Sequence, residues 1–207
     1  MSPRTAIAVA NEMRLDEGSL NQLFRDARTH STWLDRPVDE AVLRELYDLA
    51  KLAPTSANSQ PMRVAFVRSR QAKELLRPAL APQNVQKTMT APITAIIAHD
   101  LEFYEQLPQL MPHVDARGWF AGRPAEQIER AAFQGSSMQG AYFIIAARAL
   151  GLDAGPIGGF DNAKVDAAFF PDGKVRSNFI VNLGYGDPGG LYPRNPRLDF
   201  DEACQID

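Results

Sequence analysis

Cysteine and histidine are both scarce in this sequence of 207 residues. The single cysteine, Cys204, excludes an intrachain disulfide. A chain without disulfides is typical of a reducing cytoplasm, and we expect the protein there. The three histidines share no ligand spacing, and neither a Cys/His cluster nor an H-E-x-x-H sequence is present. The sequence therefore predicts no metal site.

Long apolar runs are also missing. No segment approaches the ~20 apolar residues that cross a bilayer, and the apolar patch from Ala6 to Ala10 is too short for the core of a signal peptide. We therefore expect residues 1–18 to form a flexible N-terminal leader and residues 19–207 to form a single domain. The net charge of −3 offers no basic surplus, so neither nucleic acid nor a membrane surface is expected as a partner.

Nucleotide-binding motifs are absent as well. No G-x-G-x-x-G follows the first predicted strand and no P-loop occurs, which argues against a doubly wound fold. Helices outnumber strands and do not alternate with them regularly, so the hydrophobic pattern predicts an α+β fold. The predicted helices are 19–28, 39–53, 71–80, 124–150 and 161–170, and the predicted strands are 63–68, 92–100 and 177–186.

Two of these elements have a distinctive pattern. Residues 92–100 are apolar almost without interruption, which predicts a central strand. The helix from Pro124 is apolar on nearly every side of its centre, which predicts that it is buried, and Gly151 is well placed to end it. Residues 101–123 are expected to be irregular and aromatic, and the tail from Leu191 to be extended.

Four short polar or glycine-rich segments lie between these elements. The first, Arg28-Thr29-His30-Ser31, combines a guanidinium, whose fixed fork matches paired phosphate oxygens, with neighbouring hydroxyl groups. The same residues suit an ordinary helix C-terminus, where an arginine offsets the helix dipole. Taken alone, this segment favours the ordinary interpretation.

The second segment, APTSANSQP from Ala53 to Pro61, crowds small polar side chains between two prolines. Such a turn can present donors and acceptors to the edge of a flat heterocycle, as the pyrimidine side of an isoalloxazine requires. It can equally satisfy its own backbone as an Asx or ST turn. The candidate ligand residues are Pro54, Thr55, Ser56, Asn58 and Gln60.

The other two segments lie further along the chain. Asn84 and Lys87 share one face if residues 83–89 are helical, and a lysine there would stabilise an anionic reduced flavin, although a lone lysine more often faces solvent. The turn Pro156-Ile157-Gly158-Gly159 allows close approach of the backbone to a ligand, but it also suits a tight turn. Arg194 and Arg197 in the tail could reach a phosphate or face water.

In their order along the chain, these segments resemble the FMN-dependent nitroreductase family. That family has an Arg/Ser phosphate motif, a PSSxNxQP flavin loop (here Pro54 to Pro61), an NxxK pair (here Asn84 to Lys87) and a PIxGFD turn (here Pro156 to Asp161). The stretches DARTHSTW, EFYE.LP and SN..VNLGYGD are most similar to the malonic semialdehyde reductase branch of pyrimidine degradation. Members of that branch are also described as NAD(P)H nitroreductases.

The resemblance implies an α+β fold with a central, mainly antiparallel sheet flanked by helices. It also implies an obligate homodimer with FMN at the subunit interface. One subunit would hold the flavin through residues 28–31, Asn84, Lys87, Arg194 and Arg197. The other subunit would contact it through residues 54–60 and 156–159, and the long helix from Pro124 would form the dimer core.

The implied activity is hydride transfer from NAD(P)H to flavin N5 and on to an acceptor, without a protein nucleophile. In the malonic semialdehyde reductase branch the product is 3-hydroxypropionate. Arg117 is the candidate contact for the substrate carboxylate, and an ordinary ion pair with Asp115 is the alternative. A broad-specificity NAD(P)H nitro/quinone reductase and a non-enzymatic FMN-binding protein are the other two interpretations of the chain.

The chain departs from the family at two positions. Many relatives carry a second basic residue in the N-terminal phosphate motif, but Thr32 follows Ser31 here, so phosphate binding is expected to depend more on Arg194 and Arg197. Gly158 stands where some nitroreductases have Glu. That difference removes a carboxylate near the reactive edge of the flavin and weakens the expectation of a nitroaromatic acceptor.

Overall fold

The computed structural model describes residues 14–207, and its centre is one sheet of four strands in the order β1-β2-β4-β3. All neighbouring strands are antiparallel. The predicted central strand is confirmed, because β2 lies between β1 and β4. The strands are β1 (Met62–Val67), β2 (Ile93–Asp100), β3 (Asp153–Ile157) and β4 (Val175–Gly184).

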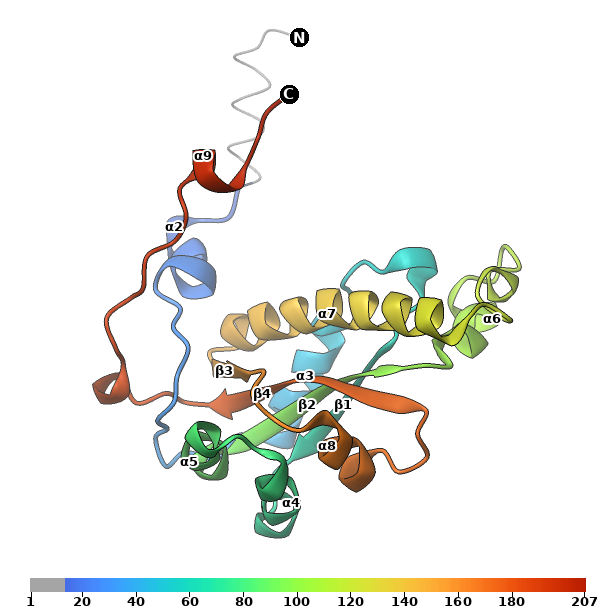
Figure 1. Cartoon of the computed structure of the whole chain (residues 1–207). Coiled ribbons are helices and arrows are strands. Elements are labelled where there is room, and N and C mark those ends of the chain that lie inside the picture. Colours follow the sequence, from blue (N-terminus) through green and yellow to red (C-terminus); the bar gives the residue numbers. More distant parts are fainter. Residues whose placement is uncertain (1–13) are drawn as a thin grey trace, which may run out of the picture.

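Helices cover both faces of this sheet, as an α+β fold with an antiparallel sheet requires (Figure 1). On one face, α3 (Glu40–Ala50) packs against the long α7 (Ala125–Ala149). The opposite face carries α4, α5 and α8 (Figure 1). The remaining bounds are α2 (Glu17–Leu20), α4 (Arg70–Leu76), α5 (Pro82–Thr90), α6 (Leu107–Leu110), α8 (Asn162–Phe169) and α9 (Phe200–Ala203).

Two apolar cores lie on the two faces of β2. Ile93, Ala95 and Ile97 point into the larger core under α3 and α7, whereas Ile96 belongs to the smaller core under α4 and α8. Side chains of a strand alternate between faces, so a strand buried on both sides is apolar at nearly every position. This explains why the continuous run of apolar residues was a good predictor of the central strand.

The first and the third predicted helices differ from their predictions. Asp16 caps α2 by accepting a hydrogen bond from the backbone N–H of Ser19 at 2.9 Å, so α2 begins inside the predicted leader, whose residues 1–13 lie outside the described part. A wider helical turn, Asn21–Arg25, completes this short N-terminal helix, which ends before the predicted Arg28. The third helix, α4, ends at Leu76 because Pro78 follows; proline lacks the N–H that would continue it.

The strand β3 was not predicted, and the helix α7 is less buried than predicted. The sequence DAGPI contains glycine and proline and reads as a turn, but it pairs with β4 as an edge strand, where proline is tolerated. In the single chain, α7 leaves an apolar stripe exposed that includes Met138 (42% exposed) and Tyr142 (44%), and Phe133 is exposed on another side of the helix. The prediction of a helix buried on all sides is therefore wrong for one chain alone.

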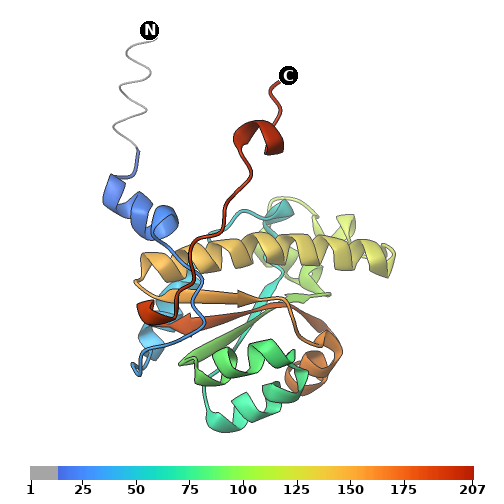
Figure 2. The ribbon, with the colours of Figure 1, turned by 60° about the vertical axis from the view of Figure 1, so that its left-hand side comes forward.

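The two ends of the described chain run together. Figures 1 and 2 show α2 and the C-terminal segment beside the C-terminal end of α7, projecting away from the sheet. Residues 191–199 are extended, as predicted, but the prediction is wrong for Phe200–Ala203, which form α9 because Asp199 and Glu202 make a capping box at its start. Large apolar side chains on both projections are exposed, among them Phe24 (51%), Leu198 (71%) and Phe200 (58%). Over residues 14–207, no helix has both the length and the apolar character that a membrane crossing requires.

Candidate functional site

The segment that follows the N-terminal helix runs along the edge of the sheet. Thr29 forms a parallel bridge with Ala154 of β3, and the backbone N–H of His30 donates to the Ala154 carbonyl at 3.3 Å. Further along, Trp33 forms an antiparallel bridge with Gly186, just after β4. These backbone contacts place residues 28–33 across the ends of β3 and β4.

Two side chains bring α5 to the same edge. The indole Nε1 of Trp33 donates to the carbonyl of Lys87 at 3.0 Å. The amide Nδ2 of Asn84, which is buried, donates to the carbonyl of Gly159 at 2.8 Å. Three of the four predicted segments therefore meet within one chain. We call this group the β3 corner; it comprises residues 28–31, Asn84, Lys87, residues 156–159 and Arg194.

One grouping implied by the resemblance is corrected here. Residues 156–159 were expected to act with residues 54–60, across the flavin from Asn84. The turn follows directly from β3, and its Gly159 carbonyl also accepts a hydrogen bond from the backbone N–H of Ala81 at 3.1 Å. Because two bonds tie Gly159 to the start of α5, the turn belongs to the same half of the site as Asn84.

The arginines predicted to bind phosphate all donate to backbone carbonyls. Arg194 donates to the carbonyls of Arg25 (2.6 Å) and Ala27 (3.0 Å), at the end of the N-terminal helix. Arg28 donates in return to the carbonyl of Tyr192. These bonds fasten the C-terminal tail to the β3 corner. Arg197 donates only to the carbonyls of its neighbours Asn195 and Pro196, so no bond brings it into the corner.

Two buried polar atoms in this region have no hydrogen-bond partner among the described residues. They are His30 Nδ1 and Arg148 Nε. The other ring nitrogen of His30 lies 3.5 Å from Asp153 Oδ1, and Asp153 Oδ2 accepts from the backbone N–H of Gly186 at 2.8 Å. Leaving a buried polar group unpaired costs about 1–3 kcal/mol, so two such atoms in one corner indicate a place where a polar ligand binds.

Glycines allow this close packing. A Cβ on Gly186 would lie 2.0 Å from Nδ1 and 2.2 Å from Cγ of His30, so only glycine fits beside that ring. Gly158 is different, because a Cβ there would meet nothing within 4 Å. The position that carries Glu in some nitroreductases is thus open to solvent here and could accommodate a side chain.

The fourth predicted segment, residues 54–60, has a strained backbone. Ala57 (φ 55°), Asn58 (φ 49°) and Gln60 (φ 42°) adopt positive φ, and no other non-glycine residue in the described part does so. Such conformations cost about 1–3 kcal/mol each and are concentrated at functional sites. Among the bonds that hold the loop, Thr55 Oγ1 accepts from the N–H of Gln60 at 3.1 Å, and Asn58 Nδ2 donates to the Leu110 carbonyl at 2.8 Å.

This strained loop is far from the β3 corner in the same chain. Thr55 and Pro61 pack near Gly135, in the middle of α7, whereas the corner lies by Arg148 in its last turn. Gly135 and Arg148 are 13 residues apart, which is ~20 Å along the helix axis. One chain therefore carries two separated halves of the predicted site.

The candidate substrate contact, Arg117, is already paired. Its Nε and Nη2 donate to the two carboxylate oxygens of Glu105, each at 2.8 Å. This hydrogen bonding raises the pKa of Arg117 and lowers the pKa of Glu105. The partner is not the expected Asp115, which instead accepts from the backbone N–H of Gly118 at 3.3 Å.

The described part of the chain offers no arrangement of side chains for a metal site. Within residues 14–207, no group of three or more His, Cys, Asp and Glu side chains is arranged to hold a metal ion. The polar groups that the fold gathers are guanidinium, ammonium, amide and backbone donors. Such a set suits a ligand that combines an anionic group with a heterocyclic edge.

Comparison with known proteins agrees with this reading. A family model described as "Nitroreductase family" matches residues 25–185. The chain belongs to the nitroreductase family. Over 93% of the chain it is 60% identical to a Burkholderia lata protein and 59% identical to a Polynucleobacter asymbioticus protein, covering 98% and 97% of them. Both are named "Putative NADH dehydrogenase/NAD(P)H nitroreductase".

Solved nitroreductase structures share the fold. A nitroreductase family protein from Streptococcus pneumoniae superposes with a TM-score of 0.78 at 22% identity, over 90% of this chain and 98% of that one. A protein from Exiguobacterium sibiricum, described as a "putative nitroreductase in complex with FMN", gives 0.83 at 22% identity over 94% and 98%. These likenesses confirm the nitroreductase fold predicted from the sequence motifs.

Proposed function

We propose that this nitroreductase is an FMN-dependent NAD(P)H oxidoreductase that works as a homodimer. The observation that carries the proposal is the division of one predicted site into two halves, the β3 corner and the strained loop 54–60. Family membership and the FMN-bound neighbour support the choice of cofactor, and the names of the close relatives support NAD(P)H as the reductant.

The β3 corner fits FMN by the chemistry of its donors. Arg28, Arg194 and the hydroxyl of Ser31 suit the phosphate. Asn84 and Lys87 suit the polar edge of the ring system, and Lys87 Nζ has no ion-pair or hydrogen-bond partner among residues 14–207. When bound, FMN supplies hydride transfer at N5 between the nicotinamide and the acceptor.

A second copy of the chain would bring the missing half. The exposed stripe of α7 and the exposed side chains of Phe24, Leu198 and Phe200 amount to more apolar surface than a lone chain usually leaves uncovered. A partner packed on α7 would carry its own loop 54–60 to the β3 corner. Thr55, Ser56, Asn58 and Gln60 would then face the same flavin from the other subunit, with Pro54 at the start of the loop.

Malonic semialdehyde is the proposed acceptor, with 3-hydroxypropionate as the product. To hold its carboxylate, Arg117 would exchange Glu105 for the substrate, which a pair that is nearly half exposed allows at small cost. The pairing of Arg117 with Glu105 also favours the alternative acceptor class, because nitroaromatics and quinones need no cation to hold a carboxylate. A broad-specificity NAD(P)H nitro/quinone reductase is therefore the second candidate.

An anaerobic visible spectrum tests the cofactor and the activity together. Purified protein is expected to show flavin absorbance that bleaches when NADPH or NADH is added. Absorbance that persists would identify a flavin-binding protein without reductase activity. A colourless protein that FMN does not reconstitute would contradict the proposal.

Replacing Arg117 with Ala separates the two acceptors. We expect KM for malonic semialdehyde to rise about tenfold or more, because a charge-assisted contact with the carboxylate is lost, while quinone reduction is unchanged. Glu105→Gln is the matched control, since it frees Arg117 without removing the cation. Equal losses of Arg117→Ala on both acceptors would rule out Arg117 as the carboxylate contact. A faster reaction with aromatic acceptors than with the aldehyde in the parent enzyme would select the broad-specificity reductase.

A further inference from the structure

The N-terminal phosphate motif lacks the second basic residue that many relatives have, and the structure offers another cation in its place. Arg148 lies in the last turn of α7, and its Nη1 donates to the carbonyl of Leu23 at 3.0 Å. The N-terminal helix also bonds to Arg148: Nε2 of Gln22 donates to the carbonyl of Arg148 at 2.7 Å. Arg148 is thus anchored at the end of the N-terminal helix.

Arg194 reaches the same helix end from the opposite terminus of the chain. Its bonds to the carbonyls of Arg25 and Ala27 lie within one turn of Leu23. Arg28 follows in sequence and is bonded to the tail residue Tyr192. Guanidinium groups from α7 and from the tail therefore meet at one helix end, and Arg28 follows that end directly in sequence.

Within residues 14–207, none of these three guanidinium groups forms an ion pair with a carboxylate. Burial and the nearby positive charge of Arg194 both lower the pKa of Arg148. The carboxylate of Asp153 raises the pKa of Arg148. Asp153 already accepts a hydrogen bond from the backbone N–H of Gly186, and its Oδ1 lies 3.5 Å from Nε2 of His30. Arg148 Nε is buried and has no partner among the described residues. Arg148 is thus a half-buried cation with an unpaired donor and a like charge, Arg194, nearby. A bound anion would pair with the donor and reduce the repulsion between the two charges.

An ordinary helix cap does not account for this arrangement. The C-terminal end of a helix is equivalent to about half a negative charge. Three full positive charges exceed that amount several times over. With the carboxylate of Asp153 also counted, a surplus of about 1.5 positive charges remains, which is comparable to the ~1.5–2 negative charges of a phosphate monoester at neutral pH.

We infer that Arg148 is a third phosphate-positioning residue, which acts with Arg28 and Arg194 on the phosphate of FMN and replaces the basic residue missing after Ser31. The inference rests on the proposed function. Arg148 contributes to phosphate binding through its positive charge and through the N–H donors that are not used in its bond to the Leu23 carbonyl. Nothing in the sequence around Arg148 indicates this role, because an arginine in the last turn of a helix is expected there anyway.

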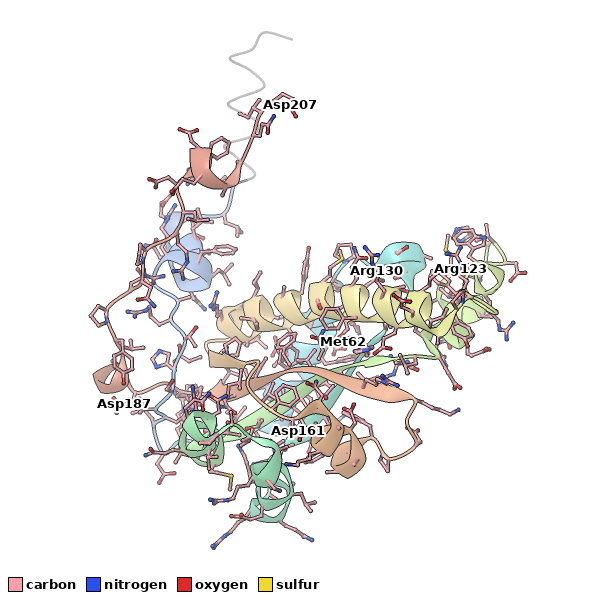
Figure 3. All side chains as sticks on the ribbon, in the orientation of Figure 1. Met62, Arg123, Arg130, Asp161, Asp187 and Asp207 are labelled. Atoms are coloured by element: carbon pink, nitrogen blue, oxygen red, sulfur yellow. The ribbon has the colours of Figure 1, made fainter. Side chains whose placement is uncertain are left out.

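The test compares FMN with riboflavin, which lacks the phosphate. Dissociation constants of both flavins are measured for the flavin-free parent protein and for Arg148→Gln, Arg148→Lys and Arg130→Gln. Arg130 is the matched control: it is exposed on the same helix, 18 residues earlier, which is ~27 Å along the axis (Figure 3).

The expected result is selective. Arg148→Gln raises Kd for FMN by roughly tenfold or more and leaves Kd for riboflavin within about twofold. Arg148→Lys, which keeps the charge, recovers most of the FMN affinity, and Arg130→Gln changes neither value. The ratio of the two dissociation constants reports the phosphate alone, so it is insensitive to general damage to the fold.

Two results would overturn the inference. Equal losses of affinity for FMN and riboflavin in Arg148→Gln would make Arg148 only a brace between α7 and the N-terminal helix. Unchanged affinity for both flavins would show that Arg28 and Arg194 suffice. If the parent protein binds neither flavin, the proposed function itself fails, and Arg148 has no phosphate to hold.

Discussion

The β3 corner and the loop 54–60 are built in opposite ways. The corner is assembled from residues far apart in sequence and is held by bonds between elements, such as Asn84 to Gly159 and Arg194 to Ala27. The loop is a single short stretch between α3 and β1, and its shape is stored locally in three positive φ angles and the bond from Gln60 to Thr55. One half of the site depends on tertiary packing and the other on local backbone geometry.

This difference shows how the halves would respond to change. Damage to packing should affect the corner most and leave the loop in place. Relief of local strain should affect the loop and leave the corner intact. A site that needs both halves loses its ligand in either case, but the stability of the fold distinguishes the two.

The largest effect is expected from Gly186→Ala. The added Cβ would lie 2.0 Å from the ring of His30, which is only 6% exposed and cannot move into solvent. Overpacking of this kind costs about 1–3 kcal/mol, and we expect the free energy of unfolding to fall by about 3 kcal/mol in urea titration. Gly158→Ala is the control, where the Cβ meets nothing within 4 Å and stability should change by less than about 0.5 kcal/mol. Equal effects of the two variants would contradict the packed corner.

A smaller effect on the free energy of unfolding, one that depends on pH, is expected from replacing Lys73, which supports α5. Lys73 is 4% exposed, and its Nζ donates to the Thr88 carbonyl (2.6 Å), the Ala91 carbonyl (3.1 Å) and Thr94 Oγ1 (2.6 Å). It therefore fixes the C-terminal end of the helix that carries Asn84 and Lys87. Burial lowers the pKa of Lys73 from 10.5 to about 8.

The sign of the pH dependence follows from that shift. Between pH 8 and 10.5 the unfolded chain keeps the Lys73 proton that the folded chain has released. The unfolded state then binds more protons, so stability rises with pH, by about 1 kcal/mol from pH 8 to 9. The unfolding free energy of the parent minus that of Lys73→Met should therefore increase with pH over this range. Lys164→Met, at an exposed lysine of α8, should show no such growth. A difference that stays flat from pH 7 to 10 would mean that Lys73 is not desolvated.

The smallest effect is expected in the loop. Ala57 has a φ of 55°, so Ala57→Gly removes strain and offsets the extra flexibility that glycine gives the unfolded chain. We expect the free energy of unfolding to change by less than about 0.5 kcal/mol. Ala141→Gly, at an exposed position in the interior of α7, should lose about 1 kcal/mol because glycine is a poor helix former. If Ala57→Gly is as destabilising as Ala141→Gly, the loop is not strained as described.

The sequence predicts well the parts of this structure that local pattern determines. The strands β1 and β2 and the helix α8 were all found close to their predicted positions. The polar loop 54–60 was identified from composition alone. Its positive φ angles were not predicted, because alanine, asparagine and glutamine do not require them.

The parts that tertiary contacts determine were the ones missed. β3 exists because β4 offers it an edge, and nothing in DAGPI indicates a strand. The apolar pattern of α7 could not show which side a single chain leaves exposed, since an interface helix and a core helix have the same apolar composition; only the resemblance suggested a dimer core. Arg148 was missed for the same reason: its neighbours Leu23 and Arg194 come from the two ends of the chain.

The central claim is that each flavin site is completed by two chains, and a mixed dimer tests it most directly. One variant, Arg28→Glu, disables the corner, and the other, Ser56→Trp, disables the loop. Neither homodimer should bind FMN. In a dimer of one chain of each kind, purified through two different tags, one site combines both defects and the other has none. The account predicts one FMN per mixed dimer, measured from the flavin absorbance. No FMN in the mixed dimer would show that each chain builds its site from its own corner and loop, and would contradict the account.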